Sequence, residues 1–183
     1  MKRRMGGRRG LTMVEIMVAL AVSAVILIGA LVLTRYMIVA ADDNRDKTFA
    51  SLQVQYAGFW ISEDVVQAQI VELGDYHGLP LTLTWTEPDD TVNEVVYTAG
   101  NMTDVFGNNL WRLEREQWID SVSLGKSVVG EYIVPASTEC VRNAHEFVSS
   151  LVLRVGAKVD TSEAVNTYEI HPRSFTQWLP EVT

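Results

Sequence analysis

A single carboxylate stands inside the longest apolar run of the sequence. The run extends from Leu11 to Leu33, follows a basic leader that ends in Gly10, and contains one charged residue, Glu15. A charged side chain at the centre of a bilayer costs roughly 2.5–3.5 kcal/mol on insertion scales, and such groups usually have a partner. Opposite charges attract strongly where water is excluded. We therefore expect Glu15 to pair with a cation.

The residues around Glu15 carry a specific resemblance. Segment 10–15 reads Gly-Leu-Thr-Met-Val-Glu. This order resembles the type III signal of type IV pilins and type II secretion pseudopilins. In that signal the residue after the glycine is most often Phe, whereas this chain has Leu11 there.

The resemblance implies a processing pathway and a set of partners. A prepilin peptidase would cut after Gly10 and methylate the new amine of Leu11. Glu15 would then pair with that amine on a neighbouring pilin or pseudopilin subunit during assembly. The implied partners are the peptidase, other subunits, an inner-membrane assembly platform and membrane lipid.

Other interpretations of the N-terminus remain open. Arg8-Arg9 before an apolar run is a feature of twin-arginine signals, and Ala19-Leu20-Ala21 fits a secretory cleavage site. Glu15 could also lie near the membrane surface, favoured there by the positive end of the helix dipole. In a further alternative, the helix only tethers an extracytoplasmic binding or adhesion module that does not polymerise.

Tests for enzyme motifs are negative. Gly125-Lys126-Ser127 resembles the end of a phosphate-binding loop, but the earlier glycine that the motif requires is replaced by Asp120. The three histidines, His77, His145 and His171, do not stand at zinc-ligand spacing. We therefore expect no enzymatic activity and no cofactor.

Two further features are candidates for metal binding and for thiol chemistry. Segment 104–109, Asp-Val-Phe-Gly-Asn-Asn, resembles the calcium loop of major pseudopilins, although a glycine-asparagine turn explains it more simply. Cys140 is the only cysteine, so the chain cannot form an internal disulfide. We expect Cys140 to be a packed thiol and predict no metal site.

Length and charge indicate the location of each part. As a helix, Leu11–Leu33 would span roughly 34 Å, enough for a hydrocarbon core of about 30 Å. The leader holds five of the 15 basic residues and none of the 23 acidic ones, so the positive-inside rule places the N-terminus in the cytoplasm. The remaining chain has a formal charge of −13, with 10 basic and 23 acidic residues. Such a balance does not favour direct binding of nucleic acid.

Periodicity predicts the elements that carry this signal. A helix is expected from Thr12 to Val71, with one apolar stripe in its second half that packs on a sheet. That stripe would comprise Phe49, Leu52, Tyr56, Phe59, Trp60, Val65, Val66 and Ile70. Alternating segments predict strands at Leu81–Thr86, Asn93–Thr98, Asn109–Glu116, Val128–Val134, Phe147–Val155 and Thr167–Phe175.

The fold class is therefore α+β, with a long N-terminal helix packed on an antiparallel sheet. Four parts are predicted: a cleaved leader (1–10), a transmembrane and assembly helix (11–34), its amphipathic continuation (35–71) and an extracytoplasmic β-rich domain (72–183). Segments 62–68, 110–115, 128–129, 147–155 and 168–175 are similar to minor pilins of the W type and minor pseudopilins of the J type. These similarities imply a minor structural subunit, in the inner membrane and then in a surface or periplasmic filament.

Overall fold

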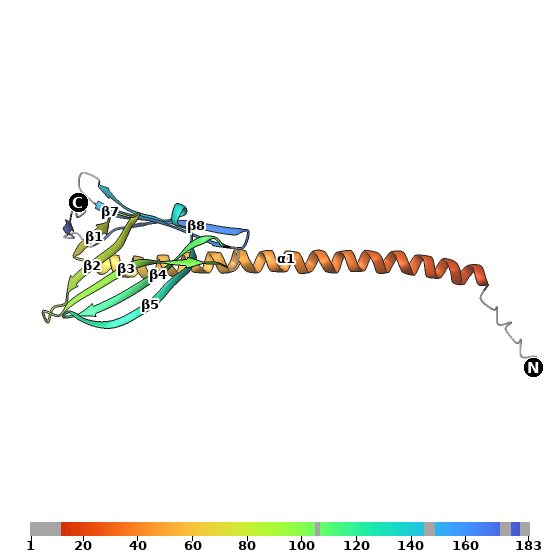
Figure 1. The fold of residues 1–183 in the computed structure, drawn as a ribbon, viewed down its shortest axis with the longest axis horizontal. Coiled ribbons are helices and arrows are strands. Elements are labelled where there is room, and N and C mark those ends of the chain that lie inside the picture. The colour runs from red at the N-terminus through yellow and green to blue at the C-terminus, as the bar shows by residue number, and fades with distance from the viewer. Residues whose placement is uncertain (1–11, 105–106, 145–148, 173–176, 180–183) are drawn as a thin grey trace, which may run out of the picture. The chain divides into compact units, whose positions relative to one another are not determined.

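The computed structural model describes residues 12–104, 107–144, 149–172 and 177–179. The chain divides into two compact units, Met1–Asp43 and Asn44–Thr183. One helix, α1 (Met13–Gln67), runs from the first unit into the second, and the strands follow it in the sequence (Figure 1). The predicted α+β class is confirmed.

Helix α1 has 55 residues, and it contains no proline. It ends where the backbone begins to pair with a strand, because the Gln69 amide donates to the Thr84 carbonyl at 2.8 Å. Ile70 and Val71, which the sequence analysis assigned to the helix, belong to the first strand instead. The apolar residues at 70 and 71 continue the helical pattern, so their periodicity alone did not reveal this change of structure.

Within the described residues, nine strands form one sheet in the order β6-β7-β5-β4-β3-β2-β1-β9, with β8 paired to β7. Neighbours are antiparallel except β1 and β9, which are parallel, and β5 meets β7 only at Ile133 and Ala157. The strands are β1 (Ile70–Gly74), β2 (Gly78–Thr86), β3 (Val92–Thr103), β4 (Asn109–Ile119), β5 (Val122–Ile133), β6 (Glu139–Ala144), β7 (Ser149–Val159), β8 (Ser162–Ile170) and β9 (Gln177–Leu179).

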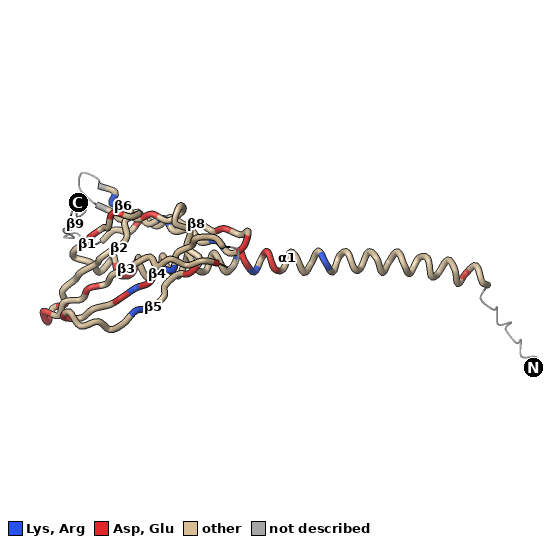
Figure 2. The backbone as a smooth tube through the Cα atoms, viewed as in Figure 1, with Lys and Arg blue, Asp and Glu red and all other residues tan. Residues whose placement is uncertain are grey.

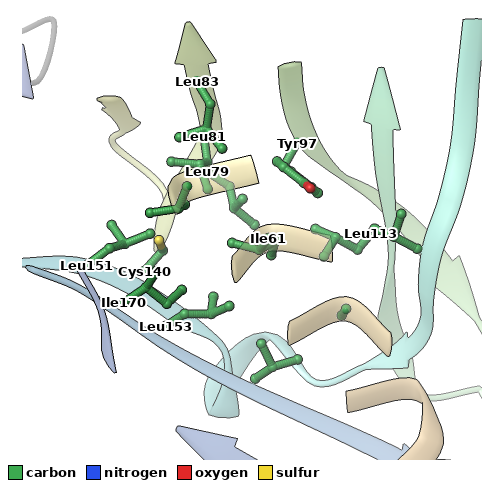
Figure 3. Packing of buried hydrophobic residues seen from close by; sticks show 14 of the residues in the cluster. Ile61, Leu79, Leu81, Leu83, Tyr97, Leu113, Cys140, Leu151, Leu153 and Ile170 are labelled. Atoms are coloured by element: carbon green, nitrogen blue, oxygen red, sulfur yellow. The ribbon is translucent and has the colours of Figure 1, made fainter. Parts of the chain in front are cut away.

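The core of the second unit lies between the sheet and one face of α1. That helix face consists of small and medium side chains, and its buried residues include Ala50, Val54, Ala57, Ile61 and Val65. Figure 3 shows Ile61 among side chains from several strands, including Leu81, Tyr97, Leu113 and Leu153. Small residues on this face allow the helix backbone to approach the sheet closely.

The predicted core stripe of α1 is wrong in most of its members. Val65 is buried as expected, but Phe49, Leu52, Tyr56, Phe59 and Val66 are exposed. The stripe of large side chains and the stripe of small ones have the same period. Ranking by side-chain size therefore selected the wrong face of the helix.

Several strand boundaries also differ from prediction. β6 lies between the predicted strands Val128–Val134 and Phe147–Val155, where no strand was predicted, and β5 begins at Val122 rather than Val128. β8 covers Ser162–Ile170 rather than residues 167–175. β5 is almost entirely exposed from Val122 to Val128, so it lacks the alternating burial that would mark its start.

Candidate assembly site and its supporting contacts

Thr12 and Glu15 form a reciprocal cap at the beginning of α1. The Thr12 amide donates to Glu15 Oε2 at 2.8 Å, and Thr12 Oγ1 donates to the same oxygen at 3.0 Å. In return, the Glu15 amide donates to Thr12 Oγ1 at 3.3 Å. This arrangement is a capping box, in which Ser or Thr before the helix and Glu three residues later satisfy each other's backbone amides. The Thr-x-x-Glu spacing therefore fixes where the helix begins.

The cap holds a carboxylate at the positive end of the helix dipole, where negative charge is favoured. Both Thr12 hydrogen bonds reach Oε2, so Oε1 receives no hydrogen bond from the described residues. Gly10 and Leu11, the predicted cleavage and methylation positions, lie outside the described residues. The structure therefore brings Glu15 together with Thr12, a partner that the sequence analysis did not identify.

The helix beyond the cap presents an apolar surface on all sides. Every residue from 12 to 39 is exposed. Ser23 and Thr34 direct their hydroxyls to the carbonyls of Ala19 and Ala30, so neither presents a free donor to its surroundings. Figure 2 shows no charged residue on this part of the helix between Glu15 and Arg35. α1 is long and apolar enough to cross a membrane.

A buried ion pair fastens the second half of α1 to the sheet. Asp64 accepts hydrogen bonds from Arg115 Nε at 2.7 Å and Arg115 Nη2 at 3.0 Å, and also from the Tyr97 hydroxyl. The three residues come from α1, β4 and β3, and Asp64 is only 4% exposed. A carboxylate buried to this extent requires a charged, hydrogen-bonded partner. Asp64 belongs to segment 62–68, whose resemblance to minor pilins did not predict this role.

The surroundings of the pair shift two pKa values. Burial, followed by the neighbouring Asp64 charge, raises the pKa of Tyr97 far above its usual value of 10.0. The hydrogen bond to Asp64 is the main cause of a raised pKa for Arg115. The Arg115 guanidinium also lies over the Trp60 ring, 5.2 Å from its centroid. Tyr97 thus stays a neutral donor and Arg115 a cation.

The other candidate groups have structural explanations. Cys140 is buried among Leu151, Leu153 and Ile170 (Figure 3), and burial raises the pKa of its thiol to about 12. This confirms a packed thiol. Asp104 accepts hydrogen bonds from the Asn108 amide at 2.8 Å and from Asn108 Nδ2 at 2.7 Å, as expected for a turn.

The residues tested as enzyme motifs have other places in the described part of the chain. Gly125-Lys126-Ser127 lies within strand β5 rather than in a loop before a helix. His77 contacts the rings of Tyr76 and Trp111, and His145 lies outside the described residues. No group of three or more His, Cys, Asp or Glu side chains among the described residues could hold a metal ion.

Comparison with known families identifies the N-terminal segment. Residues 5–31 match the family described as "Prokaryotic N-terminal methylation motif". The N-terminal segment of the chain is that of a type IV pilin-like or pseudopilin-like protein. The match includes Gly10, Leu11, Thr12 and Glu15, so the capping box lies within the pilin-like motif. This motif implies processing by prepilin peptidase and assembly with other pilin subunits, and the apolar half of α1 fits their single-pass membrane anchor. No curated protein and no solved structure matches the chain.

Proposed function

We propose that the chain is a minor structural subunit of a type IV pilus or a type II secretion pseudopilus. The peptidase cuts after Gly10 and methylates Leu11, and the N-terminus faces the cytoplasm. The exposed apolar helix then moves from lipid into a bundle of subunit helices, while the β-rich domain remains outside the membrane. The single observation that carries this proposal is the N-terminal methylation motif at residues 5–31.

The geometry of Glu15 supports its proposed role in assembly. After cleavage, the amine of Leu11 stands four residues before Glu15 in the sequence, and four residues correspond to about one helical turn. Within a subunit, Thr12 already occupies Oε2 of Glu15. A neighbouring subunit's amine can be bound by Oε1 while the cap remains intact. Leaving either charge unpaired in an apolar bundle would be costly, so the pair favours one register between subunits.

Two substitutions test this proposal in cells that contain the assembly machine. Glu15→Ala is expected to allow membrane insertion and cleavage but to reduce recovery of the subunit in sheared filaments at least about tenfold. Gly10→Phe is expected to leave the precursor uncut, because a bulky residue precedes the scissile bond. Normal incorporation of the Glu15 variant would contradict the assembly role. Unchanged processing of the Gly10 variant would contradict the cleavage site.

A further inference from the structure

Helix α1 has a second apolar stripe that remains largely exposed, although Phe49 at its start contacts the Tyr132 ring of β5. Phe49, Leu52, Tyr56, Phe59 and Val66 are between 39% and 58% exposed. A groove lined by Leu52, Gln53, Gln55, Tyr56 and Phe59 lies along the stripe. Edge-to-face contacts of Tyr56 and Phe59 with Trp60 keep the aromatic rings in place. The exposed stripe is therefore an ordered surface of neighbouring side chains.

The exposed stripe and the core face lie on opposite sides of the helix. Leu52 and Phe59 are each followed two residues later by a buried residue, Val54 and Ile61. Two residues correspond to a rotation of about 200° around an α-helix. The part of α1 that packs on the sheet thus has a buried face and an available one.

The stripe has the spacing of a coiled-coil seam. Its positions alternate by three and four residues, so 49, 56 and 63 are equivalent to a positions and 52, 59 and 66 to d positions. The flanking positions hold uncharged Thr48, Gln53, Gln55, Trp60, Ser62 and Gln67. A second helix can approach this seam without meeting a charged flank.

Glu63 is the one charged residue in the seam. It is exposed, and its carboxylate forms no ion pair within the described ranges, where the acidic partners of ion pairs are Asp64, Glu114, Glu116 and Glu131. Asp64, the next residue, faces the sheet and is already paired with Arg115. Glu63 therefore presents a negative charge to whatever covers the stripe.

We propose that the exposed stripe binds a helix of a different subunit, one that has apolar a and d positions and a Lys or Arg facing Glu63. This proposal rests on the proposed function, since it names a partner for the assembled subunit. A second copy of this chain fits poorly. Parallel in-register helices would place Glu63 opposite Glu63. The four-residue shift that pairs Glu15 with a neighbour's Leu11 amine would instead place Phe59 or Gln67 opposite Glu63. Neither register supplies a cation, which disfavours self-pairing and selects a heterologous partner.

Two helical peptides test the proposal directly. Each has three heptads with Leu at a and d, and they differ only at the a position that faces Glu63, which is Lys in one and Glu in the other. Binding to the full chain in detergent micelles is measured by fluorescence anisotropy. We expect the Lys peptide to bind about fivefold more tightly or better, and Glu63→Lys to reverse that preference.

Matched leucine variants locate the binding surface. Leu52 and Leu124 are 55% and 61% exposed, and only Leu52 belongs to the stripe. Leu52→Glu is expected to weaken both peptides about tenfold, because it places a charge in an apolar contact, whereas Leu124→Glu leaves binding unchanged. Equal effects of the two variants, no binding of either peptide, or a preference unaffected by Glu63→Lys would overturn the proposal.

Self-association provides an independent test. In membranes, chains carrying Phe59→Cys are expected to form few disulfide-linked pairs, and adding Glu63→Leu to increase them severalfold. Efficient pairing with Glu63 present would contradict the heterologous assignment. These assays require neither cleavage at Gly10 nor a filament. Their failure can therefore be distinguished from failure of the processing and incorporation tests.

Discussion

Asp64 and Arg115 form a bidentate ion pair across 51 residues of sequence, with N–O distances of 2.7 and 3.0 Å. The pair joins α1 to β4 in the interior of the second unit. The same helix segment carries the exposed stripe on its other side. The position of that stripe on the surface therefore depends on how this pair and the core orient α1.

Removing the cation should be strongly destabilising. Arg115→Met leaves Asp64 buried without its charged partner, and we expect the free energy of unfolding to decrease by about 3 kcal/mol or more. Denaturant unfolding of the full chain in micelles, followed by tryptophan fluorescence, measures this change. Arg112 on the same strand forms an exposed pair with Glu131 at 3.2 Å and serves as the control. Arg112→Met should cost less than about 1 kcal/mol; equal costs would contradict the role of the buried pair.

The Tyr168 ring packs directly against Gly58, so we expect that position 58 cannot accommodate a larger side chain. A Cβ at position 58 would lie 2.3 Å from Tyr168 Cζ, and the Tyr168 hydroxyl bonds the Val54 carbonyl at 3.3 Å. In an open helix, Gly→Ala stabilises by about 1 kcal/mol. We expect Gly58→Ala to destabilise the domain instead and to lower its melting temperature.

Gly29 provides a matched control for this effect, because a Cβ there meets nothing within 4 Å. Gly29→Ala should leave the melting temperature of the domain unchanged. Tyr168→Ala should remove most of the additional cost of Gly58→Ala in the double variant. Additive costs in the double variant would show that the ring is not the cause.

Variants of Thr12 can separate capping of the helix from the proposed assembly role of Glu15. Thr12→Ala removes the side-chain cap and is expected to cost about 1 kcal/mol of local helix stability, whereas Thr12→Ser retains it. Hydrogen exchange at the amides of Val14 and Glu15 should accelerate in the alanine variant only. Because Glu15 remains, filament incorporation should fall less than in Glu15→Ala. An equal loss in both variants would show that the assembly role of Glu15 cannot be separated from capping.

Burial of Cys140 predicts that its thiol reacts slowly in the native protein and that the domain loses stability at alkaline pH. At pH 8 a maleimide should modify the thiol only after unfolding. Folding raises the pKa of the thiol from 9.0 to about 12, so the unfolded chain loses this proton first. The contribution to stability is present below about pH 9 and is lost as the pH rises toward 12. The raised pKa of Tyr97 acts in the same direction.

The pH dependence can be assigned with Cys140→Ala. This variant should show a shallower decrease in unfolding free energy between about pH 9 and pH 12 than the parent chain, whatever its absolute stability. Rapid modification of the native thiol at pH 8 would contradict the burial. An unchanged slope in the variant would show that other groups, such as Tyr97, cause the alkaline effect.

Local patterns predicted the helix, most strands and the N-terminal motif, because each depends on neighbouring residues. The pairing of Asp64 with Arg115 could not be predicted in this way, since it depends on how α1 docks on the sheet. The buried face of α1 was missed for a related reason. Ala50, Ala57 and Gly58 face the core because they permit close approach, while larger apolar residues remain outside. The Thr12–Glu15 cap could have been predicted, because the Thr-x-x-Glu spacing is typical of a capping box. The family resemblance implied a role for Glu15 alone.

The most direct test of the account is the intact mass of the chain from its native membrane, measured with and without the processing peptidase. We expect a chain that begins at Leu11 and is one methyl group heavier only when the peptidase is present. A chain that keeps the leader in both conditions, or that begins near Val22, would contradict the pilin pathway. The β-rich domain would then be a tethered or secreted module.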